Sequence, residues 1–511
     1  MHIIKINVTM KKIFLVAMLV SAATIGYNAN AMTGDVNGDG FVTSADVTAI
    51  YDVLLGINDT FQPTADVNGD GYVTSADVTA VYDILLNGEV PDPGIPDFNI
   101  NVEYDTSNDA ATVTVAKNIR DKITVSVNGG HVNIVADPSL QDSVIYNLTG
   151  TTDNGSFYMD GDYKCIVNIT DLFITNPDSA AINIDNGKRI DINLSGNSHL
   201  VDGTGGPQKA CFFVNGHAVI DGSGILNITG NGKHAYFSDE YTVIKNGQIN
   251  VQNAQGDALH INQYFQMDGG TLNLTTVVGD GIDVGCTKDP SDTNNGQIII
   301  NDGTINVSVF GDAVKGIKCE SIMTVNGGWI TSSTAGDAIY DTEKADISSC
   351  AAIKCDSTFN MTAGTVSLVS TGTGGKGLNC DGSINISGGT FYAVTTGDVY
   401  EYSSTLDTKA GGMKADGYIT LSGGTVLVAA SSDDAKAFNG KCGFFTNGGY
   451  ILGIGGKSST VSSGYTQKYK YYRNQVITGG STVTYDGVSM NIPSYYSNSS
   501  AMVTVSSPEI Q

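Results

Sequence analysis

The stretch Gly269-Gly-Thr-Leu-Asn-Leu-Thr-Thr-Val-Val-Gly-Asp-Gly-Ile-Asp-Val284 shows the repeat that decides the fold of most of this 511-residue chain. It contains two short runs in which apolar and polar residues alternate, joined by a Gly-Asp-Gly turn. Alternation is typical of β-strands, because successive side chains point to opposite faces of a sheet. The stretch therefore predicts strand, turn and strand.

The second of these runs recurs as a small residue, an apolar residue, a polar residue and a small apolar residue. Clear copies start at Ala181, Ala258, Gly281, Gly316, Ala352, Gly377, Gly412 and Ala437, and looser copies start at Cys211 and Ala235. The copies lie 23–25 or 30–36 residues apart. Three short strands in a minimum coil of about 23 residues are typical of a parallel β-helix. We therefore predict a mainly all-β fold, with a parallel β-helix of about ten coils over residues 98–456 and a β cap over 457–511.

Upstream of the strands, one twelve-residue segment occurs twice at a spacing of 31 residues, first as Asp35-Val-Asn-Gly-Asp-Gly-Phe-Val-Thr-Ser-Ala-Asp46. Oxygen-bearing side chains stand at positions 1, 3, 5, 9 and 12, with Gly at position 6, as in an EF-hand loop that binds Ca²⁺. An apolar helix follows each loop, and no comparable helix precedes it. The predicted metal ligands are Asp35, Asn37, Asp39, Phe41, Thr43 and Asp46 in the first loop, and Asp66, Asn68, Asp70, Tyr72, Thr74 and Asp77 in the second.

A duplicated loop and helix with Asp at position 12 resembles the type I dockerin, a small all-α domain that would cover residues 32–88 here. The resemblance implies docking onto a cohesin module of a scaffold protein through loop positions 10 and 11, which are Ser44, Ala45, Ser75 and Ala76. Because the two halves are nearly identical, it also implies docking in which either half can bind. The alternative is a calcium-stabilised spacer without a partner.

Residues 1–31 predict a signal peptide, with a basic start at Met10-Lys-Lys12, an apolar run over 13–20 and the cleavage site Ala29-Asn-Ala31. Met10 is an alternative start of translation. The apolar run is too short for a bilayer span, so we predict a secreted protein without membrane insertion, held at a cell surface only through a scaffold. Three prolines in residues 89–97 predict a linker.

Charge and cysteine content narrow the function further. Three of the 26 basic residues lie in the signal segment, which leaves 23 against 52 acidic residues. Such an excess of negative charge argues against nucleic acid as a partner and suits a protein rich in calcium sites. Eight cysteines are too few for a disulfide scaffold. For Cys319, Cys355 and Cys380, which share one inward column, we predict small apolar packing, with a disulfide between neighbouring coils as the alternative.

The repeated Ile-Lys-Cys phrases predict a column of lysines on the outside of the coils. If their apolar residues point inward, Lys318, Lys354, Asn379 and Lys414 point outward, and acidic residues follow each strand. Such lysines could pair with the carboxylates of a linear polyuronate, and calcium could bridge sugar and protein carboxylates. The predicted carbohydrate-binding residues are Lys318, Glu320, Lys354, Asp356, Asp381, Lys414 and Asp416. The alternative is a surface ladder of Lys–Asp pairs that only offsets repulsion.

Acidic residues also recur at the turn before this strand, and they are a second set of candidate calcium ligands. These are Asp257, Asp280, Asp312, Asp337, Asp398 and Asp434. Asp and Gly are also simply good turn residues, which is the competing interpretation. His234 and His260 show no partner in the sequence and are interpreted as structural. Because Trp329 is the only tryptophan, stacking on a sugar would depend on Tyr340, Tyr400 and Tyr402.

From Val125 to about Gly456 the chain resembles a secreted carbohydrate-binding β-helix family associated with clostridial cellulosomes. The resemblance rests on phrases such as Gly222-Ser-Gly-Ile-Leu-Asn-Ile-Thr-Gly-Asn231, Gly256-Asp-Ala-Leu259 and Gly279-Asp-Gly-Ile282. It implies a right-handed parallel β-helix that binds calcium, with cellulose or polygalacturonate as ligand.

The predicted function is therefore calcium-dependent, non-catalytic binding of a polysaccharide, recruited to a cohesin-bearing scaffold. One alternative is a pectate-lyase-like enzyme, in which calcium acidifies a uronate and a lysine removes its α-proton. Lys315, Lys318, Lys354 and Lys414 are eligible bases. A second alternative is a surface adhesin in which the strands form only a stalk. An even repeat of lysines, without one irregular constellation, favours binding.

Overall fold

The computed structural model describes residues 33–38, 42–57, 63–69, 72–87, 95–107, 110–276, 278–287 and 290–511. The predicted signal peptide and most of the predicted linker lie outside these residues. The chain is mainly β with two α-helices near its start, and no helix in the described ranges has the length and apolar character that a membrane span needs. One compact unit ends at Ile174 and a second comprises Thr175–Gln511, so the boundary falls inside the segment that the sequence groups as one domain.

The two α-helices follow the duplicated loops, and each begins just after loop position 9. Helix α2 is Ser44–Leu54 and α3 is Ser75–Asn87, with the short 3₁₀ helix η1 (Pro63–Ala65) between them. A capping box starts α2, because the Thr43 hydroxyl accepts from Ala45 N and the Asp46 carboxylate accepts from Thr43 N. The helices bury an apolar face formed mainly by Val47, Ile50, Val53, Val78 and Val81.

Strands of the first unit form both antiparallel and parallel pairs. They are β1 (Asn99–Asp105), β2 (Ala110–Val115), β3 (Ile123–Asn128), β4 (Gly130–Ala136), β5 (Val144–Thr152), β6 (Gly155–Asp160) and β7 (Cys165–Asn176), with the 3₁₀ helix η2 (Arg120–Lys122) before β3. Pairs β1–β2 and β3–β4 are antiparallel, whereas β1–β5, β4–β6 and β5–β7 are parallel. The sheet is therefore mixed.

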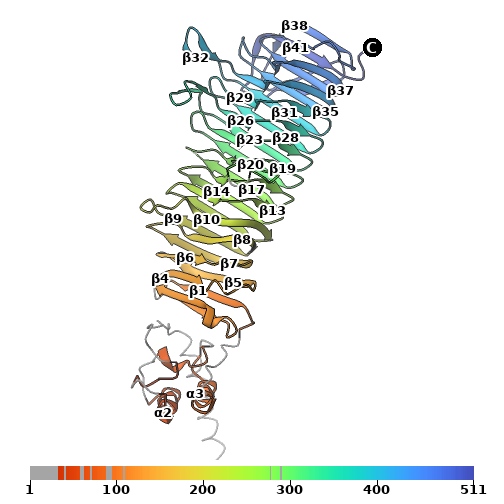
Figure 1. The fold of residues 1–511 in the computed structure, drawn as a ribbon. Helices are drawn as coiled ribbons and strands as arrows, with labels where there is room; N and C mark the ends of the chain where they lie inside the picture. Colours follow the sequence, from red (N-terminus) through yellow and green to blue (C-terminus); the bar gives the residue numbers. More distant parts are fainter. Residues whose placement is uncertain are drawn as a thin grey trace, which may run out of the picture. The chain divides into compact units, whose positions relative to one another are not determined.

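The second unit stacks its strands in three columns, in which each strand pairs in parallel with its equivalent one repeat later (Figure 1). The first column contains β12 (His234–Ser238), β15 (Leu259–Ile261), β18 (Ile282–Val284), β21 (Lys315–Cys319), β26 (Ala351–Cys355), β29 (Lys376–Cys380), β34 (Gly411–Ala415) and β36 (Phe438–Gly440). The second contains β13 (Thr242–Ile244), β16 (Phe265–Met267), β19 (Ile298–Ile300), β22 (Met323–Val325), β27 (Phe359–Met361) and β30 (Ile384–Ile386). The third contains β9 (Asn197–Asp202), β11 (Ile225–Gly230), β14 (Gln248–Ala254), β17 (Thr271–Thr276), β20 (Thr304–Val309), β23 (Trp329–Thr334), β28 (Thr365–Ser370) and β31 (Thr390–Thr395).

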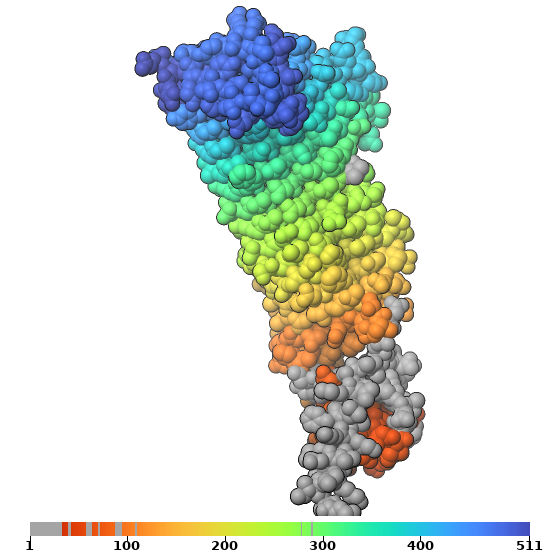
Figure 2. Space-filling view, turned by 180° about the vertical axis from the view of Figure 1, so that it is seen from behind, coloured from red at the N-terminus to blue at the C-terminus, as the bar shows by residue number. Residues whose placement is uncertain are grey.

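Longer strands lie at the beginning and at the end of these columns. Strands β8 (Ile182–Ser195) and β10 (Ala210–Gly222) pair in parallel at the start, and β35 (Tyr418–Ala430) pairs in parallel with β37 (Gly443–Gly455) near the end. The last strands, β38 (Tyr469–Ile477), β39 (Thr482–Tyr485), β40 (Val488–Asn491) and β41 (Asn498–Ser506), form antiparallel pairs and a separate apolar core. In the space-filling view, sequence neighbours of this unit follow one another in bands from yellow-green to blue (Figure 2).

Apolar stacks form the interior of the second unit, and the repeated phrases align within them. Ile317, Ile353, Leu378 and Met413 are equivalent in the pairing, and all four are buried. The same register aligns Cys319, Cys355, Cys380 and Ala415, which are also buried. Cys319, Cys355 and Cys380 form no disulfide, so they occupy small positions in the core.

Two of the long repeats carry antiparallel hairpins that project beside the first column (Figure 1). They are β24 (Ile339–Asp341) with β25 (Asp346–Ser348), and β32 (Tyr400–Ser403) with β33 (Leu406–Thr408). The hairpins contact each other through Tyr340 and Tyr402, whose parallel rings lie 3.8 Å apart between centroids. One face of each ring is therefore covered by the other ring.

Candidate functional site

The last residue of each duplicated loop closes that loop through its carboxylate. In the first loop, Asp46 Oδ1 accepts from Val36 N (2.8 Å) and Asn37 N (3.0 Å), while Oδ2 accepts from Thr43 N (2.7 Å). Asp77 does the same in the second loop, with Val67 N, Asn68 N and Thr74 N at 2.8, 3.1 and 2.7 Å. Both carboxylates are fully buried. The two loops, which are nearly identical in sequence, therefore also have nearly identical hydrogen bonds.

The other predicted calcium ligands are only partly placed. Asp35 and Asp66 are buried at the first position of each loop, and the side chain of Asp66 accepts from Gly69 N at 2.8 Å. Asp39, Phe41 and Asp70 lie outside the described residues. The donors that the structure places are carboxylate, amide and hydroxyl oxygens, which is the donor set that Ca²⁺ prefers.

The four predicted cohesin-contacting residues are exposed in the first turn of their helices. The same helices, together with the residue that caps the end of α2, expose two pairs of large side chains at the same spacing of 31 residues, which the sequence analysis did not single out. These are Tyr51 with Tyr82 and Leu55 with Leu86. The exposed polar and apolar groups thus repeat together along α2 and α3.

The residues of the predicted lysine column are aligned by the pairing of their strands, but each lysine amine forms a salt bridge with a carboxylate of the protein. Lys318, Lys354, Asn379 and Lys414 are equivalent residues of adjacent strands. Lys318 Nζ lies 2.9 Å from Asp283 Oδ1, and Lys414 Nζ lies 3.3 Å from Asp416 Oδ1. Lys354 contacts Asp381 at 2.7 Å and also pairs with Asp356. Glu320 instead accepts from the backbone N–H and the thiol of Cys286.

A cavity of about 480 Å³ lies beside this column, at the base of the second hairpin. Its lining includes five lysines, which are Lys376, Lys409, Lys414, Lys436 and Lys457, and two aspartates, Asp407 and Asp434. Lys457 pairs with Asp434. Among the residues that the structure describes, Lys376, Lys409 and Lys436 form no salt bridge with a carboxylate. Sequence reasoning missed this cavity, because its lysines come from several turns and strands rather than from one repeated phrase.

The buried Lys376 and the half-buried Lys315 have lowered pKa values, and both stand at the start of a strand in the first column. Burial and, to a smaller extent, the nearby charge of Lys414 lower the pKa of Lys376 to about 7. Its Nζ donates to Gly374 O and to Thr408 Oγ1 at 3.0 Å, both neutral acceptors. Burial also lowers the pKa of Lys315, whose Nζ donates to Ala313 O and Ser348 Oγ.

Several Gly-Asp turn residues support the next repeat through their carboxylates. Asp257 Oδ1 accepts from Asp280 N, Asp280 Oδ1 from Lys315 N, Asp312 Oδ1 from Asp337 N, and Asp337 Oδ1 from Thr373 N, at 2.7–2.8 Å. Only Asp257 and Asp280 join a third acidic residue, Asp283, in a group with metal-binding spacing within the described ranges. Burial and the charges of Asp257 and Asp283 raise the pKa of Asp280 to about 7. Asp398 is exposed, and Asp434 belongs to the lysine cavity.

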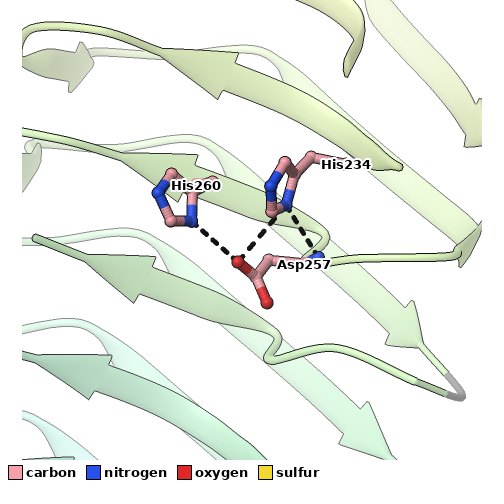
Figure 3. A group of neighbouring side chains, drawn as sticks. All are labelled: His234, Asp257 and His260. Carbon is pink, nitrogen blue, oxygen red and sulfur yellow. Dashed lines mark hydrogen bonds and ion pairs between the residues drawn. The ribbon is translucent and has the colours of Figure 1, made fainter. Parts of the chain in front are cut away.

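The interpretation of His234 and His260 as residues without partners is wrong. His260 Nδ1 lies 2.7 Å from Asp257 Oδ2, and His234 Nδ1 accepts from Asp257 N at 2.9 Å (Figure 3). The sequence held a signal for this contact, because the two histidines are 26 residues apart, close to one repeat. The expected tyrosine platform is also changed, since Tyr340 and Tyr402 stack on each other.

Comparison with known proteins gives two family matches and one similar structure. A family described as carbohydrate-binding domain-containing protein matches residues 128–399, and the type I dockerin domain matches residues 33–86. No curated protein matches. A solved structure of the polysaccharide lyase-like protein from C. thermocellum, a gadolinium derivative, is 20% identical with a TM-score of 0.39, over 56% of this chain and 96% of that one. The chain belongs to the family of carbohydrate-binding domain-containing proteins and carries a type I dockerin domain ahead of that match.

Proposed function

We propose that this chain is a secreted, non-catalytic protein that binds an anionic polysaccharide and is recruited by its dockerin to a cohesin-bearing scaffold. The strand region would be a right-handed parallel β-helix of about ten coils, which presents its ligand site along one side. The observation that carries the proposal is the lysine cavity beside the second hairpin. It concentrates five of the chain's 26 basic residues in a protein of net charge −26.

Charge pairing favours the cavity over the outward lysine column as the main anion site. Each lysine of the column already faces a carboxylate, so a uronate would have to displace a protein partner. Lys409 and Lys436 line the cavity and have no such partner among the described residues. A lysine amine and a carboxylate form a charge-assisted hydrogen bond, roughly twice as strong as a neutral one. A polymer with regularly spaced carboxylates, such as a polyuronate, fits this arrangement better than a neutral glucan.

The dockerin would supply both the partner and the calcium dependence. Ca²⁺ would hold each duplicated loop together through its oxygen donors, with Asp46 and Asp77 at the last position. Cohesin would dock on the first turns of α2 and α3, where exposed residues repeat at the loop spacing.

Affinity for polygalacturonate tests the proposal directly. Full-length protein is incubated with soluble polygalacturonate or with insoluble cellulose, and binding is measured by affinity electrophoresis or co-sedimentation. We expect binding to polygalacturonate that weakens as salt rises, because screening reduces the attraction between charges. Equal binding to the neutral polymer, insensitive to salt, would contradict an anion site.

A lyase is the second candidate function, and the state of Lys376 favours it. A general base works best when its pKa lies near the working pH, and burial brings the pKa of this lysine to about 7. Lys376 was not among the four bases eligible from sequence. Ultraviolet absorbance of an unsaturated uronate product separates the candidates: it rises with time for a lyase and stays flat for a binding protein.

A further inference from the structure

Two histidines and two aspartates converge on three adjacent strands of the second unit. His234 starts β12, Asp257 precedes β15, and His260 and Asp283 are paired residues at the centres of β15 and β18. Figure 3 shows both imidazole rings directed at the Asp257 carboxylate from the same side. His260 Nδ1 lies 2.7 Å from Asp257 Oδ2, His234 Nδ1 lies 3.3 Å from the same oxygen, and Asp283 Oδ2 lies 3.6 Å from His260 Nδ1.

Neighbouring hydrogen bonds leave His234 Nδ1 and the facing carboxylate oxygens as acceptors. The backbone N–H of Asp257 donates to His234 Nδ1 (2.9 Å), so this nitrogen carries no proton. Its 3.3 Å contact with Asp257 Oδ2 therefore brings two lone pairs together without a hydrogen between them. Asp257 Oδ1 is taken by Asp280 N, and Asp283 Oδ1 by Lys318 Nζ. The second oxygen of each carboxylate remains directed at the imidazoles.

Local charge also favours a cation at this point. Asp257, Asp280 and Asp283 have ligand oxygens within 4.8 Å of one another, and Lys318 forms a salt bridge with only one of them, Asp283. His234 is 6% exposed, so these groups gain little screening from water on that side. Closely spaced carboxylates repel one another strongly when they are shielded from solvent, and a bound cation relieves that repulsion.

We propose that this cluster is a site for a divalent first-row transition metal of the Zn²⁺ type, bound by His234 Nδ1, Asp257 Oδ2 and His260 Nδ1, whose ligand atoms lie within 4.8 Å of one another. Asp283 Oδ2, which lies 3.6 Å from His260 Nδ1, would be the fourth ligand. Bonds of 2.0–2.2 Å to nitrogen and oxygen place tetrahedral ligand atoms about 3.3–3.6 Å apart. The metal would replace the proton between His260 and Asp257, and His234 would exchange its backbone hydrogen bond for the metal. Imidazole nitrogens select such a metal over Ca²⁺, which prefers oxygen ligands.

The site would join three successive strands and would be distinct from the calcium sites of the proposed function. Its test uses Co²⁺ as a spectroscopic probe, added to the full-length chain in saturating Ca²⁺ so that oxygen-only sites are filled. We expect one Co²⁺ to bind with visible absorption bands of nitrogen and oxygen coordination, and H260Q to weaken this binding at least tenfold. The matched control is H217Q, because His217 also pairs with an acidic residue, Glu240, and stacks on an aromatic ring, Tyr241.

Equal Co²⁺ binding by wild type, H260Q and H217Q would overturn the proposal, provided that circular dichroism shows the variants folded. If H260Q does not fold, crystals of the wild-type protein soaked in Zn²⁺ decide the question by anomalous scattering. A peak between His260 and Asp257 supports the site, and its absence overturns it. Polygalacturonate binding is measured separately, so a failed metal site leaves the proposed function standing, and the reverse is also true.

Discussion

Residues 33–87 and residues 175–511 assemble their candidate binding groups in opposite ways. In the first region, each set of calcium donors lies within twelve consecutive residues, and the carboxylate of Asp46 or Asp77 closes the loop locally. In the second region, the cavity lysines range from Lys376 to Lys457 and meet only because distant strands pair. The first kind of site can be recognised from its ligands alone, whereas the second depends on every neighbour that shares the space.

Removal of calcium should unfold the first region and leave the second folded, and this is the largest effect that we expect. Without Ca²⁺, the loop carboxylates repel one another, so α2 and α3 should lose their helical signal in far-ultraviolet circular dichroism on addition of chelator. The strand region should keep its cooperative thermal transition, because its core is apolar. Helicity that survives chelation in the full chain would contradict the assignment of the loops as calcium sites.

Removal of two cavity lysines should affect only the second region. The double substitution K409M and K436M keeps the side-chain length but removes two amines that form no salt bridge with a carboxylate among the described residues. We expect affinity for polygalacturonate to fall at least tenfold, which corresponds to about 1.4 kcal/mol. Binding to a cohesin module should not change. Wild-type affinity in the double variant would show that the cavity is not the anion site.

The binding of polygalacturonate should depend on pH through Lys376. Its pKa of about 7 means that this amine gains its charge as the pH falls through neutrality, while the uronate carboxylates stay ionised down to about pH 4. Affinity measured at pH 5.5 should therefore exceed affinity at pH 8.5 several-fold. The variant K376M should show a flat profile over the same range, and an unchanged slope in that variant would assign the titration to another group.

The smallest effect should come from the outward lysine column, which the sequence favoured as the ligand site. The single substitution K354A removes an amine that already pairs with Asp356 and Asp381 and that does not line the cavity. A uronate would have to displace these protein carboxylates to reach the amine, so we expect a change in affinity of less than about threefold, or about 0.7 kcal/mol. A loss as large as that of the cavity variant would restore the column as the main site.

Prediction from sequence worked best where the interacting residues lie close together in the chain or belong to a phrase that is repeated almost unchanged. The dockerin loops, their helices and the alignment of the Ile-Lys-Cys phrases all follow from spacing. The prediction of isolated histidines failed because His234 and His260 come from adjacent repeats, and their common partner Asp257 stands in a turn. Alternation shows which way a side chain points, but it does not show which charge faces it.

The sequence alone determined the order of the regions, the mainly β character of the chain and the local calcium motif, because these depend on the periodicity of side chains and on neighbours within a dozen residues. Only the tertiary structure decided which lysines are paired, where the cavity lies and which imidazoles share a carboxylate. Those properties depend on distances between residues from different repeats and hairpins. Coulomb energy, burial and hydrogen bonding change over a few ångströms, a scale that sequence spacing does not specify.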